Sequence, residues 1–101
     1  MSKLLTIKAL LVDDDFMILE LLAAFLESKG YLVIRANNGK TALEFIKQGG
    51  INLVVTDWAM PFMDGVELCC AIRQHSQDSY IYIIMLTSNS NEDALVTAME
   101  A

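Results

Sequence analysis

Short apolar runs and longer periodic segments alternate along this chain. The runs are rich in Val, Ile and Leu, and the segments between them carry apolar residues at every third or fourth position. A short apolar run is typical of a buried strand, and the longer period is typical of a helix with one face toward a core. The pattern predicts strands at residues 8–12, 31–36, 53–56 and 80–86, and helices at residues 15–29, 40–48, 64–75 and 91–101.

Turn residues separate the predicted elements. Gly30 is the expected stop of the first helix, and Gly49 and Gly50 follow the second. The side chains expected to face the core are Ile18, Leu22, Phe25 and Leu26 in the first helix, Leu43 and Ile46 in the second, Leu68 and Ile72 in the third, and Leu95, Ala98 and Met99 in the fourth. Strands that alternate with helices are joined by right-handed crossovers, which predicts an α/β fold with a parallel sheet.

The first predicted helix is apolar nearly all round. Between Phe16 and Leu26, Glu20 is the one polar residue. A helix of this kind needs cover on more than the side that faces its sheet. We therefore expect either a longer natural protein or burial of this surface in a homodimer, and the alternative is a monomer with an exposed apolar helix.

Composition indicates one globular domain. The chain has 101 residues, of which 54% are hydrophobic, and this is enough for one core and too apolar for a disordered segment. Its apolar stretches are too short and too often interrupted by charge to cross a bilayer. No basic segment followed by an apolar stretch opens the chain, so we expect neither a signal peptide nor a membrane partner.

Charge and cysteine usage narrow the function further. The formal net charge is −6, and the seven basic residues do not cluster, which argues against direct binding to nucleic acid. Cys69 and Cys70 are adjacent in a predicted helix, where a disulfide would be strained. We expect both to be buried or half-buried apolar side chains in a reducing cytoplasm. With His75 as the single histidine, the ligands of a zinc site are missing.

Acidic residues follow two of the predicted strands. Asp13, Asp14 and Asp15 come directly after the strand at residues 8–12, and Asp57 follows the strand at 53–56. Parallel strands place their carboxyl ends at the same edge of a sheet, so an acidic pocket is expected there. Such a pocket suits a hard cation such as Mg²⁺, and a carboxylate beside the cation can accept a phosphoryl group. Asp15 is better placed to cap the first helix.

These pieces resemble the receiver domain of two-component response regulators. The resemblance runs from about Ile7 to the last residue, and three motifs occur in the family's order. They are the acidic cluster, Asp57 with the tail Met60-Pro61-Phe62-Met63-Asp64-Gly65, and Leu86-Thr87-Ser88. The resemblance implies a flavodoxin-like (CheY-like) doubly wound sheet with strand order 2-1-3-4. Residues 1–101 would then form one incomplete receiver domain, since the family's fifth strand, its lysine and its last helix are missing.

The resemblance also implies roles for individual residues. Asp57 would be the phosphoacceptor and Thr87 the switch hydroxyl. Asp14 would bind Mg²⁺ (or Mn²⁺) directly and Asp13 largely through water, with Asp57 and the backbone carbonyl of Ala59 completing the site. Without the family's lysine, phosphorylation is expected to be slow and the conformational response weak.

A receiver domain implies particular partners. The phosphoryl donor would be a histidine kinase or a phosphotransfer protein, an output domain would be attached in the full-length protein, and the location would be cytoplasmic. Such a domain modifies itself and does not turn over a free substrate, so we do not expect an enzyme in the usual sense.

Three other readings compete with this one. The first is a receiver-like interaction or dimerisation module that no longer cycles phosphate, which the missing lysine favours. The second is a flavodoxin-type cofactor binder, but Asp13-Asp14-Asp15 would repel the phosphate that such a loop holds. The third is a phosphatase with an aspartate nucleophile, but Ala59 stands where these enzymes carry a second Asp.

Overall fold

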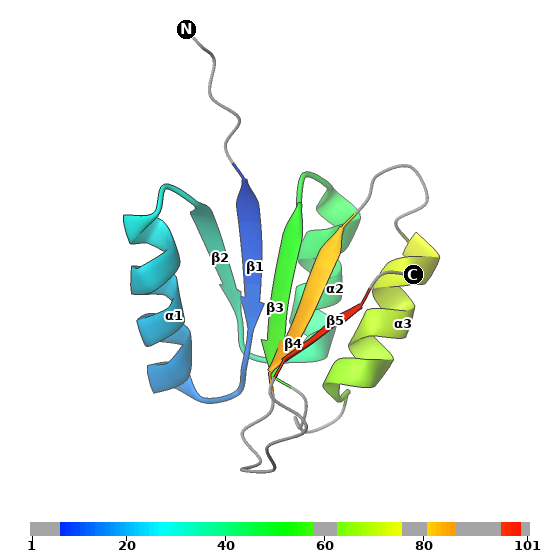
Figure 1. Cartoon of the computed structure of the whole chain (residues 1–101). Helices are drawn as coiled ribbons and strands as arrows, with labels where there is room; N and C mark the ends of the chain where they lie inside the picture. The colour runs from blue at the N-terminus through cyan, green and yellow to red at the C-terminus, as the bar shows by residue number, and fades with distance from the viewer. Residues whose placement is uncertain (1–6, 58–62, 76–80, 87–95, 100–101) are drawn as a thin grey trace, which may run out of the picture.

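The computed structural model describes residues 7–57, 63–75, 81–86 and 96–99, and the elements within them are labelled in Figure 1. The strands are β1 (Lys8–Val12), β2 (Leu32–Ala36), β3 (Leu53–Asp57), β4 (Tyr82–Leu86) and β5 (Val96–Met99). The helices are α1 (Phe16–Ser28), α2 (Gly39–Gln48) and α3 (Gly65–His75). The observed ends of the first seven elements lie within two residues of the predicted ends.

The sheet has the order β2-β1-β3-β4-β5. The first four strands are parallel, and β1 lies between β2 and β3. This confirms the predicted parallel order 2-1-3-4. Parallel strands that follow one another in the chain are joined by crossover connections, and α1, α2 and α3 are these connections.

The predicted fourth helix is wrong where the structure describes it. Val96–Met99 forms β5, which pairs antiparallel with β4, so that Leu86 lies opposite Val96 and Ile83 opposite Met99. Pairing with β5 satisfies backbone groups that β4 would otherwise present at the edge of the sheet. This strand also differs from the parallel fifth strand of the receiver fold. Whether the natural protein continues to that strand and to a last helix stays a prediction.

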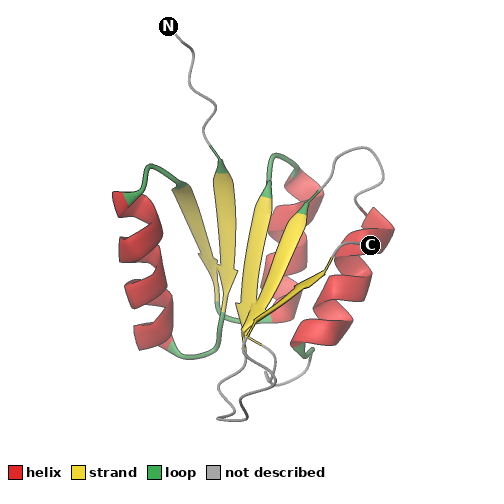
Figure 2. Cartoon of the chain, in the orientation of Figure 1, coloured by secondary structure: helices red, strands yellow, loops and turns green. Residues whose placement is uncertain are grey.

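The helices form two layers around the sheet (Figure 2). Side chains alternate between the faces of a strand, so Leu10 and Val12 of β1 face one way and Leu11 the other. Leu10 and Val12 join the larger core with Leu68 and Ile72 of α3. Leu11 joins a smaller core beneath α1. The predicted inward residues of α2 and α3 are confirmed, because Leu43, Ile46, Leu68 and Ile72 all belong to the larger core.

The predicted inward face of α1 is only half right. Leu22 and Leu26 pack on the smaller core, but Phe25 is 59% exposed and Ile18 is 38% exposed. The fully buried residues are instead Leu19 and Ala23. A helix that is apolar nearly all round gives no phase information, so its orientation is decided by the surface against which it packs.

Helix ends follow local chemistry. Asp15 and Asn38 cap α1 and α2, and each side chain accepts a hydrogen bond from a backbone N–H of the first turn. Gly30 has φ +96°, a left-handed conformation that ends α1 as the sequence predicts. Within the described segments, no helix combines the length and the apolar character needed to cross a membrane.

The two cysteines differ in their surroundings. Cys69 is buried in the larger core, where burial raises the pKa of its thiol. Cys70 is exposed, so the expectation that both side chains are at least half buried is wrong for Cys70. Both thiols are free. Neighbouring helical residues point about 100° apart, and this separates one thiol from the other.

Candidate functional site

Three carboxylates meet at the carboxyl end of the sheet. Asp13, Asp14 and Asp57 each offer one oxygen atom, and these atoms lie within 4.8 Å of one another. Asp13 is almost buried, Asp57 is half buried and Asp14 is exposed. The structure therefore brings together the residues in which the sequence predicted an acidic pocket.

Parallel strand pairing places these residues side by side. In the β1–β3 ladder, Val12 lies opposite Thr56, so the residue that follows each of them comes to the same edge of the sheet. Those residues are Asp13 and Asp57. Asp57 is itself the last residue of β3 and lies opposite Leu86 of β4, so its backbone is aligned with the end of β4.

Hydrogen bonds hold the turn after β1. The backbone N–H of Asp13 donates to the carbonyl of Ala36 at 3.1 Å, which ties the turn to the end of β2. Asp13 Oδ1 accepts from the backbone N–H of Asp15 at 2.9 Å. Asp15 in turn accepts from the N–H groups of Met17 at 2.9 Å and Ile18 at 3.4 Å. The expectation that Asp15 caps the helix is confirmed, and Asp15 is not among the three carboxylates whose oxygen atoms lie together.

The electrostatics of the cluster are unfavourable without a cation. The pKa of Asp13 is raised from 3.8 to about 6, first by burial and then by repulsion from Asp57, Asp14 and Asp15. The hydrogen bond that Asp13 accepts from the backbone N–H of Asp15 partly offsets this rise in pKa. Oxygen ligands from a few carboxylates, with room for retained water on the exposed Asp14 side, fit the preferences of Mg²⁺. A divalent cation would offset the repulsion that the three carboxylates impose on one another.

Two predicted site residues cannot be placed. Ala59 and Thr87 lie outside the described residues, as does Trp58. Their roles stay predictions.

The start of α3 is held by two reciprocal hydrogen bonds between Asp64 and Glu67. The N–H of Asp64 donates to Glu67 Oε1 at 3.0 Å, and the N–H of Glu67 donates to Asp64 Oδ1 at 2.9 Å. This capping box fixes the start of α3. Our reading of the sequence missed it, although Asp64 followed three residues later by Glu67 is the signal that predicts it.

The match to known proteins now decides the family. The model of the response regulator receiver domain matches residues 9–101. The chain belongs to the response regulator receiver domain family. The predicted receiver fold and its phosphoacceptor signalling function are therefore established at the level of the family.

Two curated relatives differ in how much of their own length the match covers. The chemotaxis protein CheY of Pseudomonas aeruginosa is 30% identical over 95 residues, which cover 93% of this chain and 77% of that protein. The alkaline phosphatase synthesis transcriptional regulatory protein PhoP of Bacillus subtilis is 39% identical over 93 residues, which cover 92% of this chain and 38% of that protein.

Solved receiver structures share the fold. The response regulator TrrA of Thermotoga maritima, in complex with Mg²⁺ and BeF, has a TM-score of 0.77 and 38% identity, covering 84% of this chain and 72% of that one. TrrA in complex with the histidine kinase ThkA has a TM-score of 0.76 and 37% identity, covering 85% and 72%. Receivers of this family are signalling switches that bind Mg²⁺ in an acidic pocket, and the carboxylate cluster matches that pocket in composition.

Proposed function

We propose that Asp57 accepts a phosphoryl group from a phosphohistidine of a histidine kinase or a phosphotransfer protein. Asp13, Asp14, Asp57 and the backbone carbonyl of Ala59 would hold Mg²⁺ or Mn²⁺ beside it. The observation that carries this proposal is the convergence of three carboxylate oxygens within 4.8 Å at the carboxyl end of the sheet. The complex of TrrA with ThkA supports the class of partner.

The chemistry follows from the position of Asp57. One carboxylate oxygen of Asp57 attacks the phosphorus atom, a P–O bond forms, the P–N bond to the donor imidazole breaks, and the imidazole leaves with the bonding electrons. Mg²⁺, when bound, would supply positive charge that offsets the negative charge of the phosphoryl oxygens. Pairing of β3 with β1 and β4 holds the backbone of Asp57 in place, so the carboxylate is positioned before the donor arrives.

The positive charge available near the phosphoryl group affects the expected rate of phosphorylation. The lysines of this chain are Lys3, Lys8, Lys29, Lys40 and Lys47, and none follows β4. None of these lysines stands where receivers place the cationic partner of the phosphoryl group, so we expect slow phosphorylation of residues 1–101 when they are tested by themselves. Thr87 would donate a hydrogen bond to the phosphorylated Asp57 and draw its own loop inward. We further propose that the domain works in the cytoplasm, joined to an output domain and without turnover of a free substrate.

Intact-mass spectrometry tests the proposal. The protein is incubated with acetyl phosphate and Mg²⁺, and a single phosphate adduct is expected. The adduct should be lost in Asp57→Asn and in EDTA. Asp64→Asn is the matched control, because it removes the carboxylate seven residues along the chain from Asp57 while keeping an oxygen that can cap α3. If Asp57→Asn retains the adduct, or if a chain extended through a fifth strand also fails to react, the proposal is wrong.

A second function is favoured by the surface of α1. Met17, Leu21 and Phe25 are 70%, 67% and 59% exposed. Burying these side chains from two copies would remove on the order of 1,000 Å² from water, which is near the lower limit for a specific interface. We propose a homodimer through α1 as the alternative role, that of an interaction module that does not cycle phosphate. Sedimentation analysis of the protein and of Leu21→Gln tests it, and a monomer at all concentrations would contradict it.

A further inference from the structure

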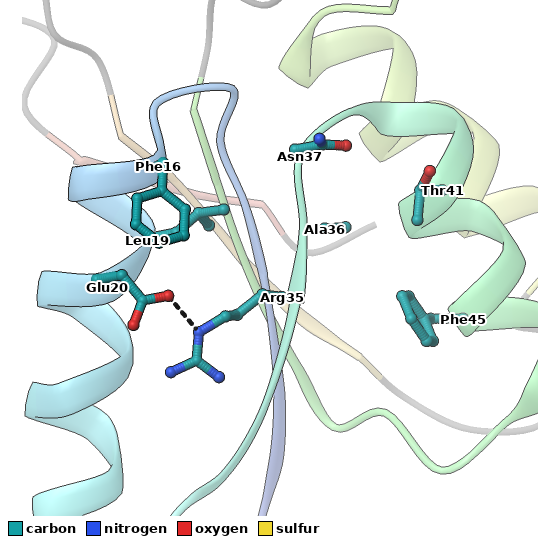
Figure 3. Close-up of a pocket in the computed structure, with 8 residues that line it drawn as sticks. All are labelled: Phe16, Leu19, Glu20, Arg35, Ala36, Asn37, Thr41 and Phe45. Carbon is teal, nitrogen blue, oxygen red and sulfur yellow. Dashed lines mark hydrogen bonds and ion pairs between the residues drawn. The ribbon is translucent and has the colours of Figure 1, made fainter.

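A hollow of about 350 Å³ crosses the free edge of the sheet. β2 pairs only with β1 among the described strands, so it is an edge strand there. Figure 3 shows Phe16, Leu19 and Glu20 of α1 on one side of β2, and Thr41 and Phe45 of α2 on the other. Arg35, Ala36 and Asn37 lie between them. The hollow therefore has an aromatic wall on each face of the sheet.

Some backbone N–H and C=O groups of β2 point away from β1, toward the edge of the sheet. In a parallel ladder, alternate residues of a strand bond to the neighbouring strand. Leu32 N–H donates to the Ile7 carbonyl at 3.0 Å, and the Ala36 carbonyl accepts from Asp13 N–H at 3.1 Å. This register turns Leu32 and Ala36 toward β1, and it turns the N–H and C=O groups of Val33 and Arg35 outward.

Arg35 supplies a charge at the same place. Its Nε contacts Glu20 Oε2 at 2.9 Å, and both side chains are more than one third exposed. Figure 3 shows the two terminal nitrogens of Arg35 on the side of the guanidinium that faces away from the Glu20 carboxylate. A second carboxylate could therefore contact the guanidinium without displacing Glu20.

We propose that the β2 edge binds an extended peptide segment of a partner protein by strand addition, with an acidic residue of that segment over Arg35. Backbone hydrogen bonds to Val33 and Arg35 would supply affinity, and the two halves of the hollow would supply specificity. Successive side chains of an added strand point to opposite faces, so one set would contact Phe16 and the other Phe45. The inference is independent of phosphorylation at Asp57.

Amide hydrogen exchange followed by NMR tests the mode of binding. The probe is the synthetic peptide acetyl-Leu-Val-Glu-Val-Thr-amide, whose glutamate shares a face with the leucine and the threonine. Exchange should slow at the outward amides of Val33 and Arg35. It should stay unchanged at Leu32, Ile34 and Ala36, which already bond to β1. A control peptide carries N-methyl groups on the alternate residues whose N–H groups would bond to β2. This peptide should not bind. Slowing confined to other parts of the molecule, or none at millimolar peptide, would overturn the proposal.

The charge requirement has its own control. Replacing the glutamate of the peptide with lysine should weaken binding by about threefold to fivefold, as for an exposed ion pair. The preference for glutamate should be lost or reversed in Arg35→Gln, which leaves the Glu20 carboxylate unpaired, and it should persist in Lys47→Gln, which removes an exposed lysine of α2 that does not line the hollow. If the difference persists in Arg35→Gln, Arg35 does not select the acidic residue. If the edge pairs with a second copy of this chain, the dimer will form without peptide, and the proposal fails.

Discussion

Gly39 allows Met63 to pack directly against the start of α2. A Cβ atom added to Gly39 would lie 2.8 Å from Met63 Sδ and 3.0 Å from Met63 Cβ. Met63 also contacts the larger core, and it is the first described residue after the segment that follows Asp57. Side-chain space at Gly39 is thus linked to the position of Met63, which stands six residues after Asp57 in the sequence.

Gly39→Ala should therefore weaken both the fold and metal binding. Overpacking against Met63 costs about 1–3 kcal/mol, and the better helix propensity of alanine returns at most about 1 kcal/mol. We expect a net loss in the free energy of unfolding of about 1 kcal/mol, measured by urea denaturation. Mg²⁺ affinity, followed through the fluorescence of Trp58, should fall as well. In the double variant with Met63→Ala the two losses should not add, and strict additivity would show that Gly39 and Met63 are not coupled.

The stability of the metal-free domain should decrease as the pH rises from about 4 to 7. The pKa of Asp13 is about 6 in the folded protein and 3.8 as the reference value, so the folded state binds the proton more tightly. The stabilisation from this proton is complete below pH 4 and is lost as the pH passes 6. Urea denaturation in EDTA across this range measures the slope. A slope in Asp13→Asn as steep as in the wild type would contradict the assignment to Asp13.

Asp13→Asn should stabilise the metal-free domain at pH 7. Asparagine keeps an oxygen that can accept from the N–H of Asp15, and it removes the repulsion that Asp13 shares with Asp57 and Asp14. We expect a gain of about 1–2 kcal/mol in the free energy of unfolding. The same variant should lose most of its Mg²⁺ affinity. Unchanged affinity would show that Asp13 is not part of the metal site.

Mg²⁺ affinity should itself depend on pH. A cation and a proton compete for the Asp13 carboxylate, whose pKa is about 6. The apparent dissociation constant should be about tenfold higher at pH 5 than at pH 7. Titration of Trp58 fluorescence with Mg²⁺ at the two pH values measures this ratio, and a ratio near one would contradict the competition.

Asp15→Ala should destabilise α1 by about 1 kcal/mol. The substitution leaves the N–H groups of Met17 and Ile18 without their acceptor. Asp15→Asn, which retains the acceptor, should cost much less. Thermal unfolding compares the two variants, and equal losses would show that the charge of Asp15 matters more than its hydrogen bonds.

Local pattern was enough to predict most of the fold. Short apolar runs placed β1 to β4 and the period of 3.6 residues placed α1 to α3, because each pattern reflects how a segment meets a core. Asp13, Asp14 and Asp57 could be assigned to one pocket from sequence, since parallel strands must end at the same edge. The family motifs made this assignment specific.

Tertiary structure decided what local pattern leaves open. The orientation of α1 depended on the sheet surface beneath it, so Leu19 and Ala23 became its buried residues while Phe25 stayed exposed. Val96–Met99 became a strand because the edge of β4 offered backbone partners that a helical reading of those residues does not consider. The raised pKa of Asp13 comes first from its burial in the folded chain and then from repulsion by neighbouring carboxylates, of which Asp57 is far away in the sequence. Orientation, edge pairing and charge repulsion all arise from contacts between distant segments, and the period of a single segment does not contain them.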